Sequence, residues 1–319
     1  MFIRRFICMI GCCIPLAAAA QEVLPAREVS RAVDSAAALI RRHYVFADKG
    51  EQIAHHLQEQ YRAGSFRQVS NWKSFDSVGT AILRNFSQDG HLYLRYNPEK
   101  VAKLRTQQEH NGVDDFFHSK KSREQNYGFR EVQVLDGNTG YIRLSEINIS
   151  DESLPVLQAA MAFVARTSSL IIDLRDNGGG GSEIKPMLES YFIPGGRPLL
   201  TFHSRTGETE TDSSVALAPG MMYPGKLYIL VNKKTASAAE ALAYVMQAQH
   251  RATIVGEASA GGANHNEYHP VNNEVFISIS EAAPVLPGTQ QNWEGKGVQP
   301  DKVTASAEAL QEALKMIQM

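Results

Sequence analysis

Residues 170–181 read LIIDLRDNGGGG, a short apolar run followed by polar residues and four consecutive glycines. The apolar run is typical of a buried strand, and the glycines predict a turn before the next helix. Because glycine has no Cβ, its backbone N–H groups can face a ligand, and such a nest can hold an anion or a developing oxyanion. Four glycines exceed what a plain turn requires, so a functional loop is favoured. The loop is not a Walker phosphate loop, because no Lys-Ser/Thr pair follows, and it lacks the spacing of a dinucleotide-binding fingerprint.

The segments around this stretch alternate between strand and helix patterns from residue 126 onward. Strands are expected at 140–144, 170–174, 226–231, 253–256 and 274–280, and helices at 151–166, 182–192, 235–249 and 305–316. Such alternation predicts α/β layers. Residues 26–87 instead repeat apolar side chains at helical spacing, and a strand pattern follows at 91–96.

The composition is that of an ordinary soluble globular protein. The 319 residues carry a formal net charge of −2, and 43% are hydrophobic and 21% charged. This balance argues against a general nucleic-acid binder, which normally carries a basic face.

The first 20 residues form a predicted signal peptide. Two arginines, an apolar run and a group of alanines follow one another there, so cleavage is expected before Gln21. A retained anchor and a lipid anchor on Cys12 or Cys13 are the alternatives. All three cysteines, the third being Cys8, lie in this leader. The exported chain would therefore have neither a cysteine nucleophile nor a thiolate metal ligand.

Ser237 lies in the segment NKKTASAAE, residues 232–240, between a predicted strand and an Ala-rich helix. With Glu240 three residues on, it fits a capping box, and such a serine is more often a cap than a nucleophile. The same position also suits a nucleophile, because the helix dipole favours negative charge there. The N–H of Ala238 can then donate to an oxyanion.

Two further residues suit acid–base chemistry. His91 ends the segment QDGH and is a candidate general base for a serine, although a lone histidine is usually a surface or core residue. Glu294 follows the bulky Trp293 in a loop rich in glycine. A carboxylate partly buried there would orient an imidazole.

The order of these features resembles the serine peptidase family of tail-specific (C-terminal processing) proteases, tricorn protease and interphotoreceptor retinoid-binding protein. The resemblance covers about residues 126–304 well and the His91 region more loosely. It implies a crotonase/ClpP-like α/β core after a small N-terminal helical domain. It also implies Ser237 as the acyl-forming nucleophile and an oxyanion hole built from the N–H groups of Ala238 and of Gly178 or Gly179.

The leader pattern and the resemblance together divide the chain into a signal peptide at 1–20, an N-terminal helical domain ending in a strand at 21–98, a polar connection at 99–125 and a tail-specific-protease-like catalytic core at 126–319. The tail-specific enzymes carry an inserted PDZ domain. The residues at 98–125 are too few for one, so capture of a substrate by a PDZ strand is not expected.

The sequence departs from the tail-specific branch at its catalytic lysine. That lysine follows the serine by about 25 residues, and Gly262 stands at this position here. The chain is more similar to the tricorn and retinoid-binding branch, where a histidine from the preceding region is the base and a carboxylate supports it. His91 and Glu294 match those places. In tricorn a serine precedes the histidine and links it to the glutamate, whereas Gly90 precedes His91.

These features predict an exported, periplasmic or secreted serine peptidase in which Ser237, His91 and Glu294 are catalytic. The alternatives are a non-catalytic binder of hydrophobic ligands on the same fold and an esterase. No cofactor or metal is expected. His265 and His269 have a spacing that binds zinc on a helix, but their glycine and proline neighbours disfavour a helix. The expected partner is a peptide or protein substrate, with neither a nucleic acid nor a membrane span after cleavage, and the oligomeric state is left open.

Overall fold

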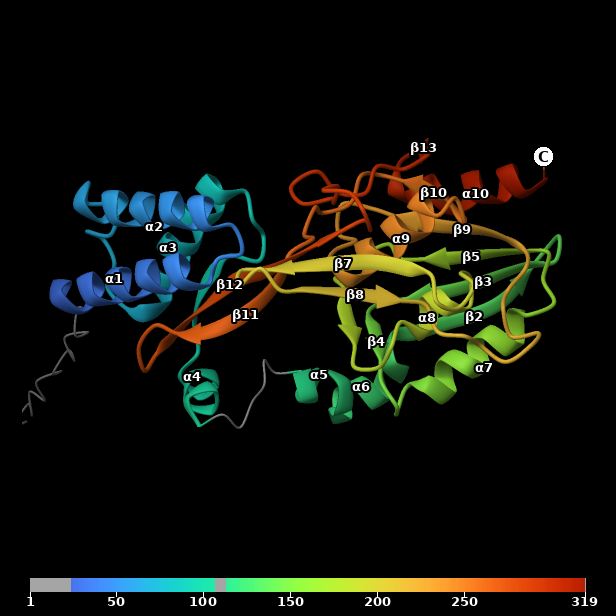
Figure 1. The fold of residues 1–319 in the computed structure, drawn as a ribbon, viewed down its shortest axis with the longest axis horizontal. Helices are drawn as coiled ribbons and strands as arrows, with labels where there is room; N and C mark the ends of the chain where they lie inside the picture. The colour runs from blue at the N-terminus through green and yellow to red at the C-terminus, as the bar shows by residue number, and fades with distance from the viewer. Residues whose placement is uncertain (1–23, 107–112, 319) are drawn as a thin grey trace, which may run out of the picture.

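A computed structural model describes residues 24–106 and 113–318, so the predicted leader with its cysteines lies outside the described residues. The described part of the chain begins with a bundle of three helices at one end of the molecule, as Figure 1 shows. These are α1 (Ala26–His43), α2 (Ala47–Arg62) and α3 (Trp72–Ser87). Their apolar faces supply one buried cluster, in which Val33, Ile40, Ile53, Leu57 and Leu83 are almost fully buried. The helical pattern predicted for residues 26–87 is thus confirmed.

The predicted α/β layers form around a six-stranded sheet. Its strand order is β13-β10-β9-β5-β3-β2, and all neighbours are parallel except β2 and β3. The strands are β2 (Phe129–Leu135), β3 (Thr139–Leu144), β5 (Ser169–Asp173), β9 (Lys226–Val231), β10 (Ala252–Gly256) and β13 (Lys302–Val303). Alternate side chains of β5 and β9 face opposite sides of the sheet, as strand geometry requires.

Helices cover both faces of this sheet. On one face lie α7 (Leu154–Val164) and α9 (Ala238–Ala248), packed into the largest buried cluster. On the other face α10 (Ala309–Gln318) packs Ala309 and Ala313 against Ile171 and Leu230. The runs 170–174 and 226–231 are therefore central strands buried from both sides, which explains why they are continuously apolar.

A second, antiparallel sheet joins the helical bundle to the core. It has the order β1-β12-β7-β8, and β11 also pairs with β12. Its strands are β1 (Tyr93–Tyr96), β7 (Pro198–Ser204), β8 (Thr209–Ser213), β11 (His265–Pro270) and β12 (Val275–Val285). The first half of β12 pairs with β1 and its last residues pair with β7, so one strand belongs to both regions. Figure 1 shows this sheet running from the bundle to the rest of the molecule.

Short elements complete the fold. They are α4 (Pro98–Arg105), α5 (Val113–His118), α6 (Lys120–Glu124), α8 (Met187–Ser190), the strand pair β4 (Ile147–Ile149) and β6 (Gly180–Ser182), and the 3-10 turns η1 (Asn126–Gly128) and η2 (Ser306–Glu308). The helix predicted at 182–192 is wrong over most of its length. Gly180 has a φ of 126° and pairs with Ile147, so the chain leaves the glycine turn as a strand and only one helical turn follows. Within the described ranges, the structure contains no helix that is long and apolar enough to cross a membrane.

Candidate active site

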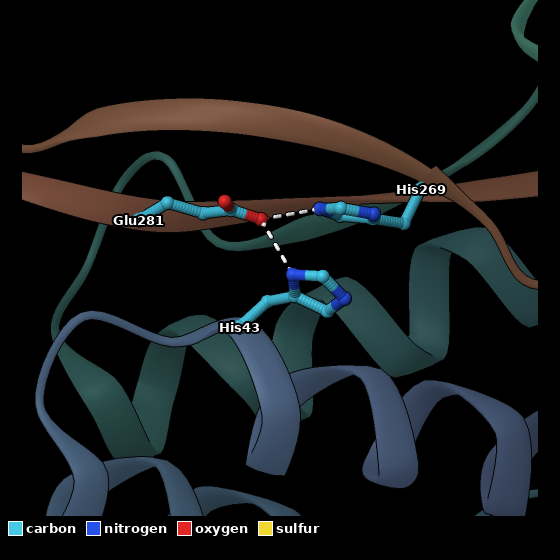
Figure 2. A group of neighbouring side chains, drawn as sticks. All are labelled: His43, His269 and Glu281. Carbon is cyan, nitrogen blue, oxygen red and sulfur yellow. Dashed lines mark hydrogen bonds and ion pairs between the residues drawn. The ribbon is translucent and has the colours of Figure 1, made fainter. Parts of the chain in front are cut away.

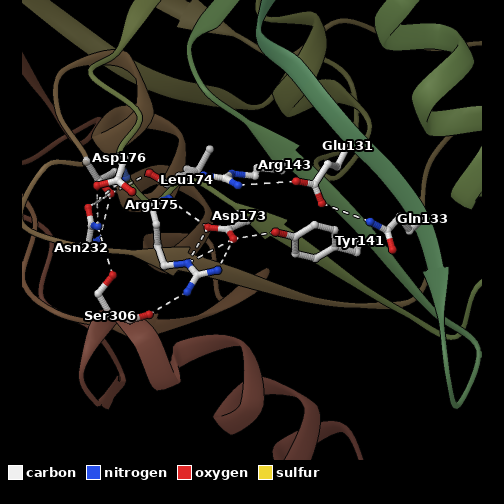
Figure 3. Close-up of polar contacts among 11 residues, drawn as sticks. Glu131, Gln133, Tyr141, Arg143, Asp173, Leu174, Arg175, Asp176, Asn232 and Ser306 are labelled. Carbon is white, nitrogen blue, oxygen red and sulfur yellow. Dashed lines mark hydrogen bonds and ion pairs between the residues drawn. The ribbon is translucent and has the colours of Figure 1, made fainter.

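The glycine turn is anchored by a polar network beneath it, shown in Figure 3. The carboxylate of Asp173, at the end of β5, is buried and accepts from the Tyr141 hydroxyl at 2.7 Å and from Arg175 Nε at 2.9 Å. Arg175 also donates to the Ser306 carbonyl at 2.7 Å, which joins the turn to the start of the C-terminal helical segment. Burial raises the pKa of Tyr141, and so does its hydrogen bond to Asp173. The network fixes where the turn leaves the sheet.

Asn177 connects this turn to the segment that carries Ser237. Its side chain donates to the Leu144 carbonyl at 3.0 Å, and its carbonyl accepts from the Ala236 N–H at 2.9 Å. Its side-chain oxygen also accepts from the Gly179 N–H at 2.9 Å. Gly179 has a φ of 101°, and a Cβ added there would lie 2.7 Å from Ser237 Cβ. The glycine turn and the serine are therefore in van der Waals contact, and only glycine fits at the contact.

The two predicted glycine donors differ in their surroundings. The Gly179 N–H is taken by Asn177, whereas the Gly178 N–H has no hydrogen-bond acceptor among the residues that the structure describes. Ala238 is the first residue of α9, where an N–H has no partner within the helix. Gly178 and Ala238 thus hold the N–H groups still open to a ligand.

Ser237 occupies a strained backbone conformation at the N-cap of α9. Its φ of 52° and ψ of −123° are unusual for a residue with a side chain. Such strain costs about 1–3 kcal/mol and clusters at functional sites. A sharp, strained turn from strand to helix is also where the α/β-hydrolases expose their catalytic serine.

Glu240 explains how this strained turn is held. Its side chain is fully buried, and one oxygen accepts from the Ser237 N–H at 2.8 Å and from the Gly262 N–H at 2.9 Å. The other oxygen accepts from Ser259 Oγ at 2.5 Å and from the Gly261 N–H at 2.6 Å. Glu240 therefore does more than cap a helix, because it ties the serine to the loop at 259–264.

The same loop holds Glu294 at its other end. Glu294 Oε2 accepts from the N–H groups of Ala263 at 2.7 Å and Asn264 at 3.0 Å. Glu294 Oε1 is buried and has no hydrogen-bond partner among the described residues. Burial and the nearby Asp89 raise the pKa of Glu294 to about 7, although the two N–H groups oppose the rise.

His91 approaches the loop from the segment between α3 and β1. The backbone N–H of His91 donates to Asp89 Oδ1 at 2.8 Å. The buried Asp89 also accepts from the Tyr44 hydroxyl at 3.0 Å and from Ser280 Oγ at 2.7 Å. The imidazole packs against Gly262, since Cε1 lies 2.9 Å from the point that a Cβ there would occupy.

Burial lowers the pKa of His91, and the carboxylates of Asp89 and Glu240 offset part of this shift. The lowered pKa favours the neutral imidazole. Its Nδ1 is buried without a partner within the described chain, as Glu294 Oε1 is. Ser237, His91 and Glu294 thus surround one loop, but no hydrogen bond joins any two of them in the described structure.

A cavity of about 630 Å³ opens beside the serine. Ser237 and Ala238 line it together with apolar side chains, among them Phe116, Phe117, Ile149, Leu200, Tyr268 and Trp293. Two carboxyl groups, Glu189 and Asp212, also line it. Burial raises the pKa of Glu189 to about 7, with a smaller contribution from Asp212. The cavity has the mixed lining expected of a site for an extended, largely apolar ligand.

Sequence reasoning missed Asp89, Asn177 and Ser259 as parts of the site. Asp89 lies in the segment QDGH and Asn177 in the segment LIIDLRDNGGGG. A polar side chain directly before a glycine is the sequence feature that could have pointed to both. The hydrogen bond between Ser259 and the buried Glu240 joins residues 19 positions apart, and no local sequence pattern reveals it.

The fold and these loops define an α/β protein in which a serine at a helix N-terminus faces a glycine turn. Residues 138–304 match the sequence profile of peptidase family S41. This match covers more than half of the chain, so the chain belongs to peptidase family S41. Residues 16–128 match the N-terminal domain of this peptidase in eukaryotic IRBP. The family and the fold predicted from the sequence are thereby confirmed.

Relatives agree with this assignment. Carboxyl-terminal-processing peptidase 1 of Arabidopsis thaliana chloroplasts is 25% identical over 175 residues, which are 55% of this chain and 35% of that protein. The structure of the photosystem II D1 C-terminal processing protease has a TM-score of 0.54 at 15% identity and covers 87% of this chain and 93% of that one. The tricorn protease has a TM-score of 0.56 at 13% identity and covers 92% of this chain and 36% of that one. The match thus spans about a third of the length of the Arabidopsis peptidase, and the two structures are similar in fold.

Proposed function

We propose that this protein is a serine peptidase in which Ser237 forms an acyl-enzyme with its substrate. The observation that carries the proposal is the strained backbone of Ser237, held between a glycine turn and a helix N-terminus at the edge of a cavity. Strained backbone conformations of this kind cluster at functional sites, which supports a catalytic role for Ser237. The membership in peptidase family S41 supports the same reaction.

In the proposed reaction, Ser237 Oγ attacks the carbonyl carbon of a peptide bond. The N–H groups of Ala238 and Gly178 are the donors proposed for the oxyanion, because they are the open ones. Gly179 has a different role, because its N–H already donates to the Asn177 side chain. Its lack of a side chain allows the glycine turn to contact Ser237.

His91 is the proposed general base. It removes the Ser237 proton during attack and later delivers it to the leaving amine. Support comes from Gly262, which stands where the tail-specific branch has its lysine. The imidazole of His91 fills the space in front of Gly262, which supports a histidine from another segment in the role of that lysine. A neutral imidazole, as the lowered pKa indicates, is the form that a base requires.

Glu294 is the proposed partner of His91. The unpartnered Oε1 of Glu294 and the unpartnered Nδ1 of His91 belong to side chains that both contact the loop at 262–264. A bridging water or a small movement on substrate binding would join them. Once ionised, Glu294 would stabilise the imidazolium that forms when His91 takes the proton.

The proposed activity lies outside the cytoplasm, in the periplasm or the surrounding medium, and the predicted leader supports this location. The expected substrates are peptides or proteins, and the apolar cavity lining favours largely apolar side chains next to the cut bond.

The test is labelling of the purified chain with a fluorophosphonate probe, followed by peptide mapping. We expect one labelled serine, Ser237, and no label in Ser237→Ala. Ser77→Ala, which changes an exposed serine on α3, is the matched control and should label fully. Folded protein that is not labelled, but binds an apolar ligand in the cavity, would show the non-catalytic binder instead.

A further inference from the structure

A cluster of three possible metal ligands lies where the helical bundle meets the antiparallel sheet (Figure 2). His43 is the last residue of α1, His269 lies on β11 and Glu281 lies on β12. Figure 2 shows both imidazole rings directed at one carboxylate oxygen. The cluster is separate from the residues proposed for catalysis.

The donor atoms of this cluster converge. Glu281 Oε1 is 3.0 Å from His43 Nδ1 and 2.5 Å from His269 Nε2, and the three donor atoms all lie within 4.8 Å of one another. Donors around a tetrahedral zinc ion at ordinary bond lengths are about 3.3 Å apart. Side-chain adjustments of less than about 1 Å would therefore admit an ion at bonding distance.

The backbone around the cluster is fixed by contacts that do not use the three side chains. The Val45 N–H donates to the Ser280 carbonyl at 2.8 Å, and the Arg205 guanidinium donates to the Arg41 carbonyl at 3.2 Å. The Arg205 N–H also donates to the Glu281 carbonyl at 3.1 Å. The end of α1 and strand β12 are thus held together, so the ligands are presented by a preorganised frame.

We propose that His43, His269 and Glu281 form a binding site for a divalent transition metal, with Zn²⁺ as the probe. Two imidazoles and a carboxylate are a known zinc ligand set, which leaves the fourth position to water. The three side chains are 20–27% exposed, so solvent and an ion can reach them. No short sequence motif joins these three residues, because they stand at positions 43, 269 and 281.

The site has a structural consequence for the proposed base. Ser280, next to Glu281, donates to Asp89, and Asp89 accepts from the His91 N–H. An ion that links α1 to β11 and β12 would stabilise the frame that carries Asp89. The ion is not part of the proposed peptide hydrolysis, and its binding is measured without any substrate.

The experiment is zinc titration of the metal-stripped full chain by calorimetry, with the bound metal measured after desalting. We expect one Zn²⁺ per chain, a higher melting temperature with zinc, and a cobalt complex whose visible spectrum indicates tetrahedral coordination. His269→Gln and Glu281→Gln should each lose the bound ion. His265→Gln, on the same strand but outside the cluster, should keep it.

A hydrogen-bonded His–Glu–His cluster without metal is the competing explanation. It would show as no retained zinc in the wild-type chain, or as equal retention by the wild type and both cluster variants, and either result overturns the proposal. Circular dichroism of each variant identifies one that fails to fold. If a variant fails to fold, His43→Asn replaces it as the test for loss of the bound ion. The cobalt spectrum of the wild-type chain then shows independently whether the ion has tetrahedral coordination. Loss of peptidase activity has no bearing on these readouts, so this proposal and the proposed function fail separately.

Discussion

The imidazole of His91 fills the space where a side chain on Gly262 would begin, with Cε1 2.9 Å from the Cβ position. The two residues lie 171 positions apart, on the loop after α3 and on the loop held by Glu240 and Glu294. Glycine at 262 and histidine at 91 are therefore complementary. A lysine at 262, as in the tail-specific branch, and a histidine at 91 would compete for the same volume.

Gly262→Ala tests this complementarity. The new Cβ would force the His91 ring to move, and misplacement of a catalytic group by about 1 Å can cost a factor of about 100 in rate. We expect kcat to fall by about 10- to 100-fold, with an unchanged unfolding transition, measured with a fluorogenic peptide and by thermal melting. Gly90→Ala is the matched control, because a Cβ there meets nothing within 4 Å and activity should be kept. Full activity in Gly262→Ala would remove His91 from the proposed mechanism.

The double variant His91→Ala with Gly262→Lys exchanges one proposed base for the other. His91→Ala alone should lose a factor of about 10² to 10⁴ in kcat, the usual contribution of a general base. Removal of the imidazole frees the volume that a lysine side chain at 262 needs. We expect the double variant to recover at least about tenfold, with its acid limb moved to higher pH, since a lysine must lose its proton to act as a base. A double variant no more active than His91→Ala would argue against a shared position for the two bases.

Glu294→Gln tests the proposed carboxylate through the pH profile of kcat/KM. The active form requires a neutral His91, whose pKa lies below its usual value, and an ionised Glu294, whose pKa is about 7. The higher of the two controls the acid limb, so activity of the wild type should fall as the pH drops below about 7. In Glu294→Gln the remaining acid limb belongs to His91 and should move to lower pH, while kcat falls by a factor of about 100 or more. An acid limb that stays in place would exclude Glu294 as the titrating group.

The sequence predicted the parts of this site but not how they meet. The strands at 170–174 and 226–231 were predictable because both are buried on two faces and are therefore continuously apolar. The absence of a full helix at 182–192 was not predictable, because the positive φ values at Gly179 and Gly180 direct the chain into a strand that pairs with β4. The contact between His91 and Gly262 depends on β12 bridging two regions. Such a contact is a property of the tertiary fold and leaves no local pattern.

Ser237→Gly tests the strain at the proposed nucleophile. Glycine adopts a φ of 52° freely, so the strain of about 1–3 kcal/mol would be relieved. The greater freedom of glycine in the unfolded chain opposes this by about 0.5–1 kcal/mol. We expect a net gain of about 1 kcal/mol in the free energy of unfolding in urea, with complete loss of activity. Ser237→Ala is the control, equally inactive but without the gain, because alanine keeps the strain. A glycine variant less stable than the alanine variant would show that the conformation carries no strain.

Glu189→Gln tests the half-buried carboxyl group in the cavity wall through the pH dependence of stability. Glu189 has a pKa of about 7 in the folded chain against an ordinary value of 4.5, so between these values the folded state holds a proton that the unfolded state has lost. The free energy of unfolding should therefore decrease as the pH rises from 4.5 to 7 and remain low above 7. Each pH unit of separation between the two pKa values corresponds to about 1.4 kcal/mol. Because each state is only half ionised at its own pKa, the decrease between pH 4.5 and 7 is smaller than the full separation, about 2–3 kcal/mol.

In Glu189→Gln this decrease is absent. Near pH 4.5 the free energies of unfolding of the variant and the wild type should therefore differ only by a constant offset. From there to pH 7 the variant should become progressively more stable relative to the wild type. Urea unfolding at several pH values measures the difference in slope, which a constant cost of the buried amide cannot imitate. Asp212→Asn provides an intermediate case, because Asp212 contributes the smaller part of the rise in the Glu189 pKa. Removing its charge should shorten the pH range of the decrease without abolishing it. Parallel pH profiles for Glu189→Gln and the wild type would mean that the Glu189 carboxyl group is solvated in the cavity and ionises near its ordinary pKa.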